Sequence, residues 1–275
     1  MSSIWLSGPK RALRGIRKHP RLATILLLLE LASSTVIGTM SLSYRQEASR
    51  AFGDPGFPWG QMIIAPILGI ILAVWWYRVF AGGPDRTENG FDNSAHTGAG
   101  VVTGLLFMLI GAVFYAAYFI AAITGFAGLL SSLSILWLAQ LALVVAALYL
   151  YLRLSPAIAL STIAGSLEVA RTWAHTRRQL IPLLKAHTSL LGIAFLCIVS
   201  WLVLSLIVRF DNGYTSMWAI SSGGTLYFDT LHAVVCALVT GAVWLPARLA
   251  QLSIHSEFAD RFFAAEETGA VETAG

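Results

Sequence analysis

The chain has few charged residues for its length. Only 12% of its 275 residues are Asp, Glu, Lys or Arg, and 57% are hydrophobic. Soluble domains carry about 25% charged residues. No uninterrupted polar stretch is long enough to bury a core of its own. These properties exclude an ordinary soluble domain and predict an all-α polytopic membrane protein with a single membrane domain.

Cysteines and catalytic motifs are also scarce. The two cysteines, Cys197 and Cys236, both fall inside apolar stretches, where a small packing residue is expected. No H-E-x-x-H, G-x-S-x-G, Walker loop or Cys–His constellation occurs, and no spacing is typical of a metal site. The sequence therefore predicts a protein that is not an enzyme and needs no cofactor or metal.

Six apolar stretches are long enough to cross a bilayer as helices, which takes about 20 residues each. The third and fourth are joined by a short uncharged link, which predicts an antiparallel hairpin. A basic segment, residues 1–21, precedes the membrane domain at about 22–254, and an acidic, partly disordered tail is expected at 255–275. The six stretches are residues 22–42, 61–80, 99–124, 129–152, 184–208 and 228–250.

The basic residues predict the orientation. If all six stretches cross, every Lys and Arg except Arg45, Arg50 and Arg209 falls on the side of the N-terminus. Basic residues accumulate on the cytoplasmic side of membrane proteins. We therefore expect a bacterial inner-membrane protein with both termini in the cytoplasm. The net charge of +4 then favours anionic lipids as partners, not nucleic acid.

Each even-numbered stretch ends in aromatic residues followed by an arginine. The arginines are Arg78, Arg153 and Arg248, after WWY, YLYL and WLPA. Aromatic rings at headgroup level with arginines that reach the lipid phosphates are typical of such ends. The pattern predicts that these arginines snorkel to the membrane surface.

Two titratable residues lie within predicted spans. Glu30 is near the middle of the first span, where a carboxylate costs about 2.5–3.5 kcal/mol on insertion scales. It is either a proton or cation site, or a neutral or hydrogen-bonded structural acid that faces the helix bundle. His232 lies in the outer part of the sixth span, and together these two residues form the candidate intramembrane polar site.

Two glycines predict a close helix contact. Gly100 and Gly104 are four residues apart in the third span, and such a small-xxx-small pattern lets a second helix approach closely. We interpret them as packing residues.

The segment between the fourth and fifth spans predicts an amphipathic helix at the membrane surface. Pro156 ends the fourth span and Pro182 begins the fifth, because proline is poorly accommodated inside a helix. Between them, residues 166–181 form an amphipathic pattern that begins at Ser166, a plausible N-cap. Its apolar side consists of Val169, Ala170, Trp173, Ala174, Leu180 and Ile181.

Basic residues accompany this apolar side. Arg177 departs from the pattern by projecting from the apolar face, which a lipid phosphate or a buried acid would explain. A solvated face that only sets the topology is the alternative to lipid binding. The candidate lipid-headgroup contacts are Arg153, Arg171, His175, Arg177, Arg178 and Lys185.

The same segment carries a resemblance to a known family. Arg153-Leu-Ser-Pro-Ala157, followed by Ser166-Leu-Glu-Val-Ala-Arg-Thr-Trp-Ala-His-Thr-Arg177, resembles the shared motif of bacterial six-helix inner-membrane proteins. That family is related to the membrane domain fused to some glycerophosphodiester phosphodiesterases. Its motif ends in Trp-x-x-Thr-Arg-Gly, and Arg178 stands here in place of the Gly. The resemblance implies a six-helix bundle of unassigned role and carries over no catalytic residue.

We therefore predict a non-enzymatic accessory or lipid-interacting membrane protein. A protein partner or self-association is left open. The alternative is a small transporter or carrier with Glu30 as its polar site.

Overall fold

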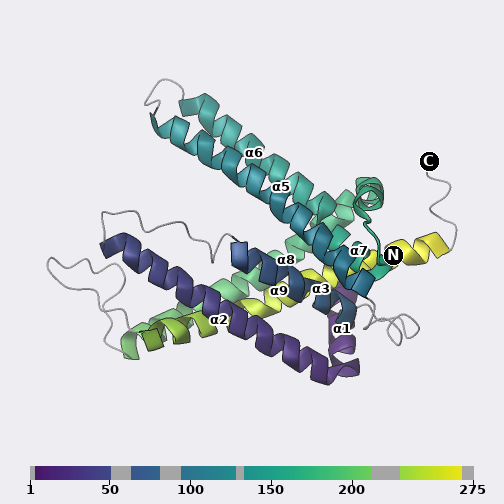
Figure 1. Cartoon of the computed structure of the whole chain (residues 1–275), viewed down its shortest axis with the longest axis horizontal. Helices are drawn as coiled ribbons and strands as arrows, with labels where there is room; N and C mark the ends of the chain where they lie inside the picture. The colour runs from purple at the N-terminus through teal and green to yellow at the C-terminus, as the bar shows by residue number, and fades with distance from the viewer. Residues whose placement is uncertain (1–3, 51–62, 81–93, 128–132, 212–229, 268–275) are drawn as a thin grey trace.

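The computed structural model describes residues 4–50, 63–80, 94–127, 133–211 and 230–267 (Figure 1). Within these residues all regular secondary structure is helical. The helices are α1 (Ile4–Lys18), α2 (Pro20–Arg50), α3 (Ala65–Phe80), α5 (Ser94–Ala127), α6 (Leu133–Leu154), α7 (Ala157–Ala164), α8 (Val169–Asp211) and α9 (Thr230–Glu267).

Five helical stretches among the described residues are long and apolar enough to cross a membrane. The predicted span at 61–80 corresponds to α3, which is apolar but has only 16 described residues. A multi-pass membrane protein is thus consistent with the structure, and a sixth crossing remains a prediction. The five stretches are Pro20–Gly38, Ser94–Ala117, Leu141–Ala164, Gln179–Ser200 and Ala237–Ala265.

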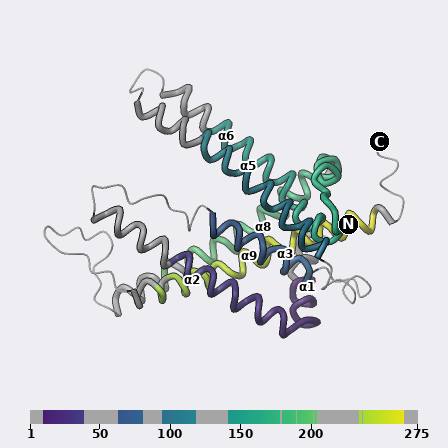
Figure 2. Tube along the Cα trace, in the orientation of Figure 1, coloured from purple at the N-terminus to yellow at the C-terminus, as the bar shows by residue number. Residues whose placement is uncertain are grey.

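The helices converge at one end of the molecule and diverge from it. α5 and α6 pack side by side and extend away together, as the sequence predicts for this hairpin. α2, α8 and α9 leave the convergent end in another direction, with α9 packed against both α2 and α8 (Figures 1 and 2). The short helices α1 and α7 both lie at the convergent end.

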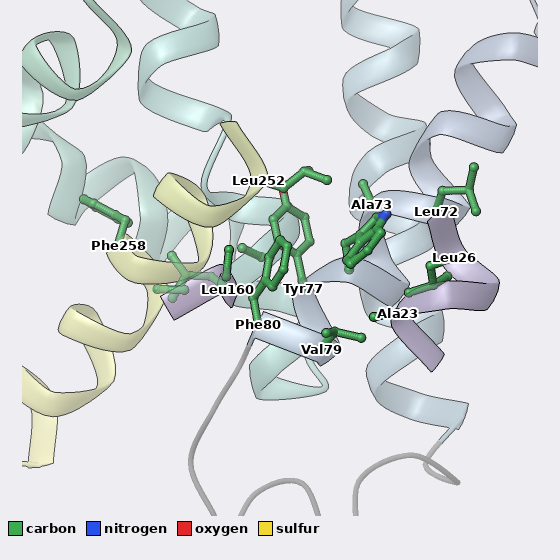
Figure 3. Packing of buried hydrophobic residues seen from close by; sticks show 14 of the residues in the cluster. Ala23, Leu26, Leu72, Ala73, Tyr77, Val79, Phe80, Leu160, Leu252 and Phe258 are labelled. Atoms are coloured by element: carbon green, nitrogen blue, oxygen red, sulfur yellow. The ribbon is translucent and has the colours of Figure 1, made fainter. Parts of the chain in front are cut away.

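The hydrophobic core lies at this convergent end (Figure 3). α3 supplies Trp76, Tyr77 and Phe80, which are almost completely buried, and the rings of Trp76 and Phe80 stack with centroids 5.3 Å apart. Such aromatic pairs contribute about 0.5–1.5 kcal/mol beyond the area that they bury. Leu160 of α7 and Phe258 of α9 complete the packing, so residues far apart in sequence hold the ends of the helices together.

The C-terminal boundary of the membrane domain differs from the prediction. Residues 255–267 belong to α9, and Phe258, Ala259 and Phe262 are buried in the core. Only 268–275 of the expected tail, 255–275, lie outside the described residues. The apolar residues recur at helical spacing, but the neighbouring acids make the segment resemble a solvated tail.

The amphipathic segment also differs in its boundaries. α8 begins at Val169 instead of 166, because Gly165 ends α7 in the left-handed conformation (φ 74°) and the Ser161 hydroxyl accepts the Glu168 N–H at 3.0 Å. α8 then continues through Pro182 with a kink at Gln179 (φ −112°, ψ 15°). Proline bends the preceding turn without ending the helix, so the segment predicted to be interfacial and the predicted fifth span form one kinked helix.

Gly100 and Gly104 lie where α5 meets α3 and α7. A Cβ atom on Gly100 would overlap Thr162 of α7 and lie 2.9 Å from Val74 of α3. A Cβ atom on Gly104 would overlap the side chain of Ile70 in α3. The small residues thus allow the close approach of three helices.

We expect Gly104→Ala to destabilise the protein. Overpacking costs about 1–3 kcal/mol, which exceeds the roughly 1 kcal/mol that alanine gains over glycine in a helix. Gly111→Ala is the matched control on the same helix, because its added Cβ would meet nothing within 4 Å. Thermal unfolding in detergent should give a lower midpoint for Gly104→Ala than for Gly111→Ala, and equal midpoints would contradict the packing described here.

Candidate functional site

Glu30 is paired with an arginine from the other end of the sequence. Its side chain is 5% exposed, and its Oε1 accepts a hydrogen bond from Arg248 Nε at 2.9 Å. Arg248 also donates through a terminal nitrogen to the carbonyl oxygen of Gly69, at 2.9 Å. One ion pair therefore connects α2, α9 and α3. Of the two alternatives for Glu30, this geometry matches the structural acid.

The second member of the predicted polar site, His232, lies in the first turn of α9, and its side chain is outside the described part of the structure. A carrier built on Glu30 would need a carboxylate that is available to a cargo ion. Arg248 occupies that carboxylate, so the main argument for a carrier is weakened.

Arg78 and Arg153, predicted to snorkel, are instead buried among protein groups. Arg78 is 8% exposed, donates to Thr97 Oγ1 at 2.7 Å and lies 5.2 Å from the centroid of the Trp75 ring. Arg153 is 4% exposed. A guanidinium group with protein partners on several sides cannot reach a lipid phosphate at the same time.

Arg153 fixes the start of α8 against the end of α6. Its guanidinium lies 3.7 Å from the centroid of the Trp173 ring, and it donates to the Trp173 carbonyl oxygen and to Thr176 Oγ1, the latter at 3.2 Å. It also donates to the Tyr149 hydroxyl at 2.8 Å. The prediction that Arg153 contacts lipid is therefore corrected, and the residue holds two helices together.

The buried side of the amphipathic segment is polar. Thr172 and Thr176, one turn apart, are completely buried, and their hydroxyls donate to main-chain oxygens of the preceding turn. Trp173 and Ile181, from the predicted apolar side, are 38% and 66% exposed. The two threonines pack against protein, and the apolar side remains on the surface, where lipid can cover it.

Arg171 and His175 have protein partners but are not enclosed. Arg171 donates to Glu168 at 3.0 Å, with 48% of its side chain exposed. His175 packs its ring against Phe258 and Phe262, with centroids 5.5 and 4.8 Å away. This burial lowers the pKa of His175 from its ordinary value, which favours the neutral form of the ring and disfavours a contact with a phosphate.

Other predicted bases are on the surface. Arg177 and Lys185 are exposed, whereas the side chain of Arg178 lies outside the described residues. Arg177 has the exposure that its proposed contact with a phosphate requires, and no buried acid is needed to explain its position.

α1 contributes a second basic surface, and none of its residues is among the predicted lipid-headgroup contacts. Lys10, Arg14 and Arg17 are exposed along one side of this helix, and Arg21, at the start of α2, is exposed as well. The spacing of three or four residues aligns the exposed bases of α1 on one face. Arg11, which is partly buried, donates to the carbonyl oxygen of Phe80 and pairs with Glu257 and Asp260. α1 is therefore fastened to α3 and α9, with its bases directed outward.

Sequence reasoning also missed a buried polar chain. Tyr77 of α3, His255 of α9 and His187 of α8 are joined by two hydrogen bonds, of 3.0 and 3.2 Å. Nothing in the spacing of the three residues could have indicated this contact, because they lie on three helices and His255 was assigned to the tail.

Comparison of the chain with protein-family models, curated proteins and solved structures gives no match. The resemblance at residues 153–177 therefore remains a prediction from the motif alone.

We expect Arg153→Lys to destabilise the protein although the charge is kept. Lysine cannot reproduce the planar fork that reaches Tyr149, Trp173 and Thr176 together, or the stacking on the indole ring. Loss of such a buried network costs about 1–3 kcal/mol. Thermal unfolding in detergent measures the change.

Arg177→Lys provides the matched control, because exposed substitutions usually change stability by less than about 0.5 kcal/mol. If Arg153 acted mainly through its charge on lipid phosphate, both variants would resemble the unsubstituted protein, and that result would refute the structural role.

Proposed function

We propose that this chain is a non-enzymatic bacterial inner-membrane protein that binds anionic lipid headgroups at its cytoplasmic side. In this proposal the chain crosses the membrane six times and has both termini in the cytoplasm. The observation that carries the proposal is the exposed basic row of α1, together with Arg177 and Lys185 on α8.

The arrangement of α1 supports this function. Because Arg11 bonds to Glu257, Asp260 and the Phe80 carbonyl, contacts within the protein hold the helix with its exposed bases outward. A preformed basic surface loses little conformational freedom on binding. Each Lys or Arg near an anionic membrane surface contributes about 1 kcal/mol of attraction.

Apolar side chains beside the bases favour a membrane surface over a soluble anion. Leu13 on α1 is 55% exposed, and Trp173 and Ile181 on α8 are exposed as well. Amphipathic helices at the bilayer interface combine such side chains, with the apolar ones in the acyl region and the bases at the phosphates.

The positions of the remaining bases support the orientation. The convergent end contains α1, the C-terminal ends of α3 and α6, and the start of α8, which together hold most of the basic residues. Arg50 and Arg209 are located at the opposite ends of α2 and α8. Because basic residues accumulate on the cytoplasmic side of membrane proteins, this uneven distribution of Lys and Arg agrees with a convergent end that lies in the cytoplasm.

Replacing the exposed bases should weaken lipid binding. The double variants Arg14→Gln/Arg17→Gln and Arg177→Gln/Lys185→Gln are expected to lower the affinity for phosphatidylglycerol by about tenfold or more, since each base contributes about 1 kcal/mol. Calorimetric titration of the lipid into protein in neutral detergent measures the affinity. Added salt should reduce the difference, because exposed charges are screened.

Arg45→Gln/Arg50→Gln removes the same charge near the far end of α2 and is the matched control. It should bind phosphatidylglycerol as the unsubstituted protein does, and phosphatidylcholine should distinguish none of the variants. Equal weakening by all three double variants, or by none of them, would rule out the proposed surface.

A further inference from the structure

The buried polar chain joins three helices. Tyr77 (α3) and His255 (α9) are 2% and 3% exposed, and His187 (α8) is the more accessible third member. The Tyr77 hydroxyl lies 3.0 Å from His255 Nδ1, and His255 Nε2 lies 3.2 Å from His187 Nε2. The chain ends at His187 Nδ1, which lies 2.9 Å from the carbonyl oxygen of Leu183.

The last hydrogen bond, between His187 and Leu183, determines where each proton of the hydrogen-bonded chain lies. A carbonyl oxygen only accepts, so His187 Nδ1 carries a proton and donates it to Leu183. In a neutral ring His187 Nε2 is then an acceptor, which requires His255 Nε2 to be the donor. His255 Nδ1 is consequently an acceptor, and the Tyr77 hydroxyl donates to it. All of the donors point in one direction, from Tyr77 toward Leu183.

The hydrogen-bonded chain can take up one proton if the hydrogen bonds Tyr77–His255 and His255–His187 both reverse direction. His187, the most accessible of the three residues, gains a proton from solution at Nε2, and the single His255 proton moves from Nε2 to Nδ1, where it is donated to the Tyr77 oxygen. Tyr77 keeps its own proton. His187 then carries two protons and the positive charge, and His255 remains neutral with its proton on the other nitrogen. Only N–H and O–H bonds are formed or broken, and the net change is one added proton.

The surroundings favour placing the charge on His187. Tyr77 and His255 are almost completely buried, so a charge at that end of the hydrogen-bonded chain would be costly to remove from water. At the other end the His187 ring contacts the Tyr151 ring of α6 edge-on, with centroids 5.7 Å apart, and Gln251 of α9 donates to the Tyr151 hydroxyl. His187 is also the most exposed of the three residues, so its charge is the least costly to hydrate.

We propose that Tyr77, His255 and His187 form a proton-binding site whose occupancy sets the direction of the hydrogen bonds between α3, α9 and α8. The site is independent of the lipid surface. It makes the contact between these helices responsive to the protonation of His187.

Nuclear magnetic resonance of the full chain, labelled with ¹⁵N-histidine and held in lipid nanodiscs, tests the site. The ¹⁵N shifts report which ring nitrogen carries a proton. As the pH falls, the His255 proton should move from Nε2 to Nδ1 at the same midpoint at which His187 becomes doubly protonated. Titration of His187 without that change at His255, or no titration of either ring while the protein stays folded, would overturn the proposal.

Two variants isolate the coupling. In His187→Gln the new amide oxygen can accept the His255 Nε2 proton but cannot bind a proton itself, so the change at His255 should disappear. His175→Gln is the matched control, since His175 lies earlier on α8 against Phe258 and Phe262, and the coupled transition should persist in it. A His255 transition that survives in His187→Gln would refute the relay, provided circular dichroism shows that the variant is folded.

Discussion

The cost of an unpaired charge in an apolar environment is the constraint on which this structure depends. An isolated buried carboxylate is strongly unfavourable, and an ionised partner with good hydrogen bonds offsets most of that cost. Glu30 and Arg248 satisfy this constraint across 218 positions of sequence. Because Arg248 also binds the Gly69 carbonyl, the pair determines how α2, α3 and α9 approach one another.

The cost of an unpaired charge also explains why Arg78 and Arg153, at the ends of α3 and α6, are directed toward protein partners. The motif of aromatic residues followed by arginine is also found where side chains snorkel to the surface, yet Arg78 and Arg153 are buried and bonded to protein groups. Among the described residues, the exposed bases include Lys10, Arg14 and Arg17 of α1 and Arg177 and Lys185 of α8. This division separates the arginines that hold the helices together from those that we propose to meet lipid.

The helical class, the α5–α6 hairpin and the break before α7 followed from hydropathy and from Pro156, which are local properties of the chain. The partner of Glu30, the burial of Arg153 and the Tyr77–His255–His187 chain did not, because each depends on contacts between distant segments. The segment at 255–267 was misjudged for a related reason. Its acids Glu257 and Asp260 suggest solvent, whereas in the structure they pair with Arg11 of α1.

The coupling energy between Glu30 and Arg248 tests this account most directly. Unfolding free energies in detergent are measured for the unsubstituted protein, Glu30→Gln, Arg248→Met and the double variant. Since Glu30 is buried and Arg248 is 37% exposed, a coupling of about 1–3 kcal/mol is expected, between the values for exposed and buried pairs. The double variant should therefore be more stable than the sum of the single changes implies, and strictly additive changes would contradict the central role of this ion pair.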